Sequence, residues 1–313
     1  MAPGRGRNEP EVRGVPHGAG GVTRARTARP DDPFVLPSEP GRENVQVAFS
    51  GGRSSAYMLH RILEANGGLP ERAVVTFQNT GREMDETLDF VEECSRRWDV
   101  PVIWLEYDPD APGMFREVSH GYADREGAPF ETLVARKRFL PNPVTRFCTI
   151  ELKIRTAKRY LRTLGWKRWW NAVGFRADEA RRLKPSRDRW ITWAPMVDAG
   201  VTRADIDAFW SRQPFGLALP MVNGRTPLGN CDGCFLKSEA TQYALARDHP
   251  ERHAWWERME AMALSGDRAR GLGHRFRSEY SKASLSRMAR DQGDFFSDHP
   301  GLLCQASGGE CAG

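Results

Sequence analysis

Short apolar runs alternate with amphipathic segments over the first half of the chain. The apolar runs, at residues 45–49, 73–77, 100–107 and 169–173, predict strands. The segments between them, at residues 54–65, 85–98 and 151–164, predict helices. This alternation is typical of a doubly wound, mostly parallel α/β sheet with helices on both faces. Such sheets bind ligands at the carboxyl ends of their strands.

The alternation of strand-like and helix-like segments ends at about residue 195. A strand ends there and a helix follows, with Thr202 as its predicted N-cap. After a stretch broken by glycine and proline, residues 239–264 predict helix and the end of the chain predicts loop. We therefore expect an α/β domain over residues 43–240. A helical C-terminal extension with a cysteine-containing tail follows over residues 241–313.

Residues 1–42 differ from both regions. They are rich in Gly, Pro and Arg and poor in large apolar side chains. Such a segment cannot bury enough surface to offset its ordering entropy, so the sequence predicts a disordered tail.

Composition narrows the functional class only slightly. No apolar run approaches the ~18 residues of a membrane-spanning helix, and the N-terminus lacks the apolar centre of a secretory signal. We therefore expect a cytoplasmic protein that contacts no membrane. The net charge of +5 is compatible with an anionic small molecule or with a nucleic acid.

The loop after the first strand carries the clearest chemical signal. It reads Ser50-Gly51-Gly52-Arg53-Ser54-Ser55 and opens the first predicted helix. Two glycines let the backbone approach a ligand closely, and the helix start offers free N–H groups and a positive dipole end. The serine hydroxyls and the arginine add donors suited to phosphate or sulfate. The sequence therefore predicts an anion site here.

Two cysteines form a tight pair in a later loop. Cys231 and Cys234 enclose Asp232-Gly233, a spacing that suits a metal, an iron–sulfur cluster, a redox pair or an ordinary loop. Cys94 lies at an apolar helix position and is expected in the core. The histidines at 249, 253 and 274 show no ligand spacing and are expected to be structural or solvated.

Five stretches, in order, resemble the phosphoadenosine phosphosulfate (PAPS) reductase family of the adenine nucleotide alpha hydrolase superfamily. They are "SGGRSS", "VVTFQNTGREMDETLDFVEEC", "RFCTIELKIRT", "VGFRADEARR" and "APMVDAGVTRADIDAFW". The resemblance spans roughly residues 45–240. Three positions depart from the family pattern: Asn79 replaces an aspartate, Ala199 an aromatic residue, and Ser54 the acid common in ATP-using branches.

The resemblance implies an adenine nucleotide site and assigns its residues. Residues 50–55 would hold the anionic bridge of the nucleotide. Beside it, Asn79, Thr80 and Gly81 would shape the adenosine pocket. The remaining binding residues would be Lys153, Gly174, Arg176 and Arg181, the two arginines neutralising phosphate or sulfate.

The resemblance also implies a metal centre. In related sulfonucleotide reductases, cysteines of the third stretch join a later C-x-x-C to hold a [4Fe–4S] cluster. Here Cys148, Cys231 and Cys234 match three ligands, and Cys304 or Cys311 would supply the fourth. Zinc, which accepts the same thiolates, is the alternative.

The chain ends in Glu310-Cys311-Ala312-Gly313, which is similar to the family's catalytic E-C-G motif. By that resemblance Cys311 attacks the sulfur of the nucleotide, assisted by Arg176, and a thioredoxin- or glutaredoxin-like protein then reduces the enzyme. Cys311 as a metal ligand or part of a frayed tail are the other interpretations.

Three functions remain open. The first is a sulfonucleotide reductase that converts PAPS or adenosine phosphosulfate (APS) to sulfite. The second is an ATP-using enzyme that inserts sulfur into a nucleic acid. The third is a non-catalytic nucleotide-binding module.

Overall fold

A single sheet organises the fold in the computed structural model, which describes residues 32–184, 188–222, 225–264 and 274–292. Within these ranges the sheet has six strands in the order β4-β3-β2-β1-β5-β6. The strands are β1 (Val45–Ala48), β2 (Ala73–Asn79), β3 (Val102–Tyr107), β4 (Phe115–Val118), β5 (Trp169–Ala172) and β6 (Trp190–Trp193). All neighbours pair in parallel except β3 and β4. The predicted doubly wound, mostly parallel α/β fold is confirmed.

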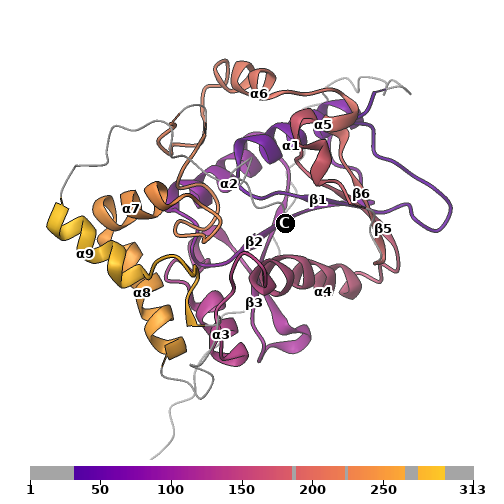
Figure 1. Cartoon of the computed structure of the whole chain (residues 1–313). Coiled ribbons are helices and arrows are strands. Elements are labelled where there is room, and N and C mark those ends of the chain that lie inside the picture. The colour runs from indigo at the N-terminus through magenta and orange to yellow at the C-terminus, as the bar shows by residue number, and fades with distance from the viewer. Residues whose placement is uncertain (1–31, 185–187, 223–224, 265–273, 293–313) are drawn as a thin grey trace, which may run out of the picture.

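One face of the sheet carries the main hydrophobic core. Helices α1 (Arg53–Asn66), α2 (Asp85–Arg97) and α6 (Arg203–Trp210) cover it (Figure 1). Apolar side chains at alternate strand positions, such as Val45 and Val47, pack against these helices because successive residues of a strand point to opposite faces.

The opposite face is lined partly by polar side chains. It is covered by a π-helical segment, η3 (Thr149–Arg155), that continues as α4 (Thr156–Thr163) (Figure 1). A smaller apolar cluster joins α4 to β3 and β5. Gln46, Gln78, Asn171 and Thr192 lie on this face, at strand positions where a doubly wound sheet ordinarily places apolar residues.

Helices α7 (Glu239–Asp248), α8 (Pro250–Leu264) and α9 (Lys282–Gln292) gather beyond α3 (Ala128–Lys137), at the left of Figure 1. Their apolar residues share one cluster with α3 and η3. The C-terminal extension therefore packs against the sheet domain through this shared cluster. The remaining short elements are η1 (Pro112–Met114), η2 (His120–Tyr122), η4 (Ala177–Arg182) and α5 (Pro195–Asp198).

Several sequence predictions differ from the structure. The predicted tail reaches residue 42, yet Phe34 and Leu36 lie in the main core, and Arg42 is buried beside Glu39. Strand β4 was not predicted, and helix α9 lies where the sequence predicts loop. Thr202 is the N-cap of α6 as predicted, with its hydroxyl accepting from the Asp205 amide. Every helix in the described ranges is too short or too polar to cross a bilayer.

Candidate functional site

The order of the strands places the site at β1. The chain moves from β1 to β2 and β3 on one side and returns to β5 and β6 on the other. The loops after β1 and β5 therefore lie next to each other at the carboxyl ends of neighbouring parallel strands, where doubly wound sheets bind their ligands.

The loop after β1 is shaped by hydrogen bonds of Ser55. Its Oγ accepts from the Ser50 amide at 3.2 Å, lies 2.9 Å from Ser50 Oγ and donates to the Gly52 carbonyl at 3.0 Å. Gly51 has a φ of +77°, and a Cβ on it would lie 2.7 Å from Thr87 on α2. Only glycine fits this tight turn, which folds the loop back over the start of α1.

The start of α1 provides the positive end of a helix dipole. Gly52 is the N-cap, so no side chain caps the helix, and the first turn holds no acidic residue. A 14-residue helix with such an end favours a bound anion.

The loop after β5 touches the same point. A Cβ on Gly174 would lie 3.0 Å from Ser55 Cα and 3.1 Å from the Ser55 amide nitrogen. The absence of a side chain at Gly174 therefore lets the two loops meet.

Arg176 follows Gly174 but is already engaged. It is buried, its Nε lies 3.0 Å from Asp178 Oδ1 and its Nη1 lies 3.4 Å from Glu179 Oε2. The Arg176 guanidinium lowers the pKa of the Asp178 carboxyl through this hydrogen bond. Two carboxylates thus compensate the charge that was predicted to neutralise a phosphate or sulfate.

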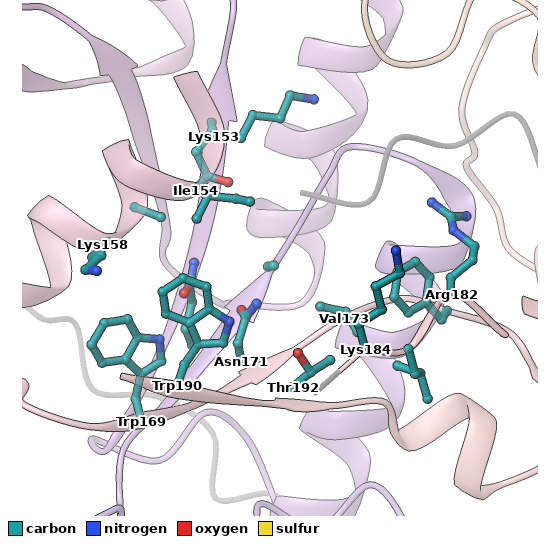
Figure 2. Close-up of a pocket in the computed structure, with 16 residues that line it drawn as sticks. Lys153, Ile154, Lys158, Trp169, Asn171, Val173, Arg182, Lys184, Trp190 and Thr192 are labelled. Atoms are coloured by element: carbon teal, nitrogen blue, oxygen red, sulfur yellow. The ribbon is translucent and has the colours of Figure 1, made fainter. Parts of the chain in front are cut away.

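A cavity of about 210 Å³ opens between the polar sheet face and the η3–α4 segment. Figure 2 shows Lys153 and Ile154 on one side, Asn171, Trp190 and Thr192 on the sheet opposite them, and Arg182 and Lys184 at one end. Among the described residues that line it, Lys153, Lys158, Arg182 and Lys184 are basic and none is acidic. Carboxylates outside the lining pair with three of these cations: Glu83 with Lys153, Asp188 with Lys158 and Glu179 with Arg182.

The floor of this cavity holds polar atoms that the protein does not satisfy. Gln78 Nε2, Asn171 Oδ1 and Trp169 Nε1 are buried and have no hydrogen-bond partner among the described residues. Gln78 and Trp169 are only 8% and 1% exposed. Buried polar groups are almost always paired, so three unpaired atoms around one cavity point to a ligand.

Comparison with known proteins agrees with this arrangement. Residues 44–191 match the family model described as the phosphoadenosine phosphosulfate reductase domain. Residues 44–191 belong to the PAPS reductase domain family. This PAPS reductase domain contains all six described strands apart from the last two residues of β6, together with the β1 loop and the cavity floor.

Two individual proteins are similar to the chain. The "uncharacterized nin region protein ORF290" of Escherichia phage lambda is 32% identical over 203 residues, which cover 61% of this chain and 66% of the phage protein. The chain thus spans just under two thirds of that relative. A PAPS reductase from Candida auris, solved as a phosphate complex, is 14% identical with a TM-score of 0.37, covering 56% of this chain and 74% of its own.

Some residues predicted to bind nucleotide lie elsewhere in the PAPS reductase domain. Arg53 pairs with Asp207 on α6 at 3.0 Å, and Ser54 is buried. Arg181 is exposed and does not line the cavity, whereas its neighbour Arg182 does. Because "EARR" offers two adjacent arginines, only the backbone path of η4 decides which one faces inward.

Asn79, Thr80 and Gly81 form a buried support. Asn79 Nδ2 donates to Glu106 Oε1 at 2.6 Å, and the Thr80 amide and hydroxyl both donate to Glu83 Oε2. Gly81 has a φ of +76° and fits against the Asp124 side chain. These three residues position the carboxyl end of β2.

The polar strand residues Gln46, Gln78 and Asn171 were missed by the sequence analysis. The signal was present: each interrupts an apolar strand at the alternate positions that face α4. Lys158 and Lys184 were missed because nothing in their local sequence separates a cavity cation from a surface cation.

The two-cysteine loop meets the carboxyl end of β2. Cys231 Sγ lies 3.3 Å from Thr80 Oγ1 and 3.9 Å from Glu83 Oε1, and Lys153 Nζ lies 3.9 Å from the same Glu83 oxygen. Cys148, at the start of η3, packs with Cys231 against the same hydrophobic cluster. The Glu83 carboxylate therefore connects the loop to Lys153, which lines the cavity.

Asp232 holds this loop from within. Its carboxylate is fully buried and accepts from Arg82, Arg252, the Gly233 amide and the Trp256 indole. Two further cations hold the loop carbonyls: Lys237 donates to Asp232 O and Lys282 donates to Gly233 O. These contacts fix the backbone of the loop that carries Cys231 and Cys234.

The described residues do not complete the predicted metal centre. Among them, no three histidine, cysteine, aspartate or glutamate side chains are arranged to hold a metal ion. Cys148, Cys231 and Cys234 lie within the described residues, whereas Cys304 and Cys311 lie outside them.

Two other predictions concern buried residues. Cys94 is fully buried in the main core as expected, and burial raises the pKa of its thiol. His253 is structural as expected: its Nε2 lies 3.0 Å from the Lys282 carbonyl.

Proposed function

We propose that the chain binds an adenine sulfonucleotide, PAPS or APS, and reduces it to sulfite and the adenosine phosphate. The observation that carries the proposal is the β1 loop. Its uncapped helix start meets Gly174 from the β5 loop, and Ala48 and Val173, which precede the two loops, line a cavity whose described lining includes four basic residues. This site supplies backbone donors and positive charge for the phosphosulfate group.

The chemistry requires a thiolate and a dithiol reductant. In the proposed reaction the Cys311 thiolate attacks the sulfur of the sulfonucleotide, and the S–O bond to the phosphate breaks. The adenosine phosphate leaves with the bonding electron pair, and the cysteine carries a sulfonate. A thioredoxin- or glutaredoxin-like dithiol then attacks the cysteine sulfur, releases sulfite and ends as a disulfide after a second thiol exchange.

One observation favours a second candidate, an ATP-dependent sulfurtransferase acting on nucleic acid. Residues 153–168 contain no acidic residue. The basic side chains of this segment are Lys153, Arg155, Lys158, Arg159, Arg162, Lys167 and Arg168. Arg155, Arg162, Lys167 and Arg168 are exposed, a charge pattern that suits a phosphate backbone.

Product analysis separates the two candidates. Anaerobically purified protein is incubated with PAPS, APS or ATP, with and without thioredoxin and DNA or RNA, while sulfite and pyrophosphate are measured. Thioredoxin-dependent sulfite release supports the reductase. Pyrophosphate release from ATP that nucleic acid stimulates supports the sulfurtransferase and refutes the reductase.

A further inference from the structure

Positive charge is concentrated in one segment of the chain. Residues 132–168 hold 11 of the 46 lysine and arginine residues but only one of the 41 acidic residues, Glu151. The rest of the chain holds more acidic than basic residues, 40 against 35, although the whole chain carries a net charge of +5. The net positive charge therefore comes from this segment, which includes the end of α3, η3, α4 and the turn before β5.

Basic side chains follow one side of α4 and continue into the turn after it. We call this set the α4 surface; it consists of Arg155, Arg159, Arg162, Lys167 and Arg168. Steps of four and three residues separate the first three arginines, so they lie on one side of the helix over about 10 Å. All members except Arg159 are exposed, and none of the five lines the cavity. The α4 surface is therefore separate from the site already described.

The one acidic residue of the segment is shared among several cations. Glu151 lies 2.7 Å from Arg155 Nη1 and 3.7 Å from Arg159 Nη2 through its carboxylate oxygens, and 3.2 Å from Lys137 Nζ on α3. Three basic side chains from two helices thus surround a single negative charge. A surface with this excess of positive charge favours a polyanionic partner.

The composition of the segment narrows the class of partner. Ala157, Tyr160 and Leu161 of α4 are buried in an apolar cluster, so the helix has no free apolar face to insert into a membrane. Arginine outnumbers lysine four to one in the α4 surface, and the guanidinium fork matches the oxygens of a phosphate.

The same segment favours a double helix over a single strand. No aromatic side chain is among the exposed residues of 132–168. Proteins that hold single-stranded nucleic acid use exposed aromatic rings on which the bases stack. A surface of cations alone contacts phosphates, which a double helix presents along its outside.

We infer that the α4 surface binds the phosphate backbone of a nucleic-acid double helix without reading its sequence. This inference goes beyond the proposed reduction and does not depend on which nucleotide occupies the cavity. The other side of the same segment lines that cavity through Ala157 and Lys158 (Figure 2). A bound duplex therefore lies against the outer wall of the nucleotide site and not inside it.

The test compares two sets of three exposed arginines, each changed to glutamine so that both variants lose the same charge. The first set, from the α4 surface, is Arg155, Arg162 and Arg168. The control set, from α8 and α9 at the left of Figure 1, is Arg258, Arg287 and Arg290. Fluorescence anisotropy measures the binding of labelled DNA duplex, RNA duplex and single-stranded DNA at about 50 to 200 mM salt.

Binding through phosphates predicts a defined pattern. The wild type binds a duplex more tightly than the single strand, and its affinity falls as salt rises. The α4-surface variant binds the duplex at least about tenfold more weakly, and the slope of log affinity against log salt becomes shallower by about 2–3. The control variant stays within about twofold of the wild type. Arg162→Gln alone shows a smaller loss in the same direction, which decides the question if the triple variant unfolds.

Four results overturn the inference. They are no binding of either duplex by the wild type at the lowest salt, tighter binding of the single strand, equal losses in the two triple variants, and competition by polyglutamate as strong as by duplex. The last result indicates an acidic protein as the partner. APS binding is measured on the same proteins. Failure of the wild type to bind APS, PAPS or ATP refutes the proposed function but leaves this inference standing.

Discussion

Gly174 shows how one missing side chain brings two loops together. A Cβ on Gly174 would lie 3.0 Å from Ser55 Cα, which is tighter than an ordinary van der Waals contact. A larger residue at this position would therefore push the β1 and β5 loops apart. We expect Gly174→Val to lower the free energy of unfolding by about 1–3 kcal/mol and to weaken nucleotide binding at least about tenfold. Denaturant titration and calorimetry measure the two effects.

The matched control is Gly216→Val, because a Cβ on Gly216 meets nothing within 4 Å. That variant should keep both stability and binding. Equal behaviour of the two valine variants would show that the loops do not depend on the close approach at Gly174.

His253 gives the C-terminal helices a pH dependence. Burial, more than the nearby Lys282 charge, lowers its pKa from 6.5 to about 4. Between these values the unfolded chain binds a proton that the folded chain does not, so stability falls as pH drops from 6.5 to 4. The loss is on the order of 3 kcal/mol. Glu260, whose pKa burial raises, acts in the opposite direction.

The measurement is therefore a difference between two proteins. Unfolding free energies of the wild type and His253→Gln are compared at several pH values, because Glu260 contributes to both. The wild-type curve should fall more steeply on acidification. Parallel curves would mean that His253 titrates normally in the folded protein.

For single residues, the sequence predicts where the backbone needs glycine better than it predicts which way a side chain points. The glycines and serines of residues 50–55 stand out because two glycines and three serines directly follow a predicted strand. Arg176 and Arg181 were expected to face an anion, yet one is paired with carboxylates and the other is exposed. Those outcomes depend on the path of η4, which local sequence does not specify.

Among the elements, the loop of residues 231–234 depends most on its surroundings. The buried Asp232 carboxylate compensates two arginines and accepts two further hydrogen bonds. Asp232→Asn leaves both guanidinium groups without a buried counter-charge and should destabilise the protein by about 3–5 kcal/mol. Urea unfolding provides the measurement.

The comparison is Asp207→Asn, which removes a half-exposed partner of Arg53. An exposed pair contributes at most about 1 kcal/mol. If the two asparagine variants unfolded at the same urea concentration, the loop would not depend on the Asp232 network.

The sequence predicted the position of each element whose apolar residues recur regularly. These elements are β1, β2, β3, β5, α1 and α2. The sequence missed β4 because its central Arg116 and Glu117 are exposed on an edge strand. It missed α9 because that helix is mostly polar and depends on tertiary contacts. Lys282, for example, is fully buried and donates to Gly233 O and Gln242 Oε1.

The folded part of the molecule includes residues that the composition assigns to a disordered tail. Phe34 is 1% exposed, its ring lies under the Arg61 guanidinium, and its carbonyl accepts from Asn66 Nδ2 at 2.9 Å. Phe34→Ala should cost about 3–5 kcal/mol of unfolding free energy, and Phe34→Leu much less. Thermal denaturation of the pair tests this. A loss below about 1 kcal/mol in the alanine variant would place residues 32–42 outside the folded unit.

The central claim is that the β1 loop and the start of α1 bind the anionic group of an adenine nucleotide. Ser55→Ala tests it most directly, because this hydroxyl accepts from the Ser50 amide and donates to the Gly52 carbonyl. Calorimetric titration with APS and PAPS should show binding to the wild type that weakens at least about tenfold in Ser55→Ala, with both proteins folded. Equal affinity in the two proteins, or no uptake of any adenine nucleotide by the wild type, would contradict the account.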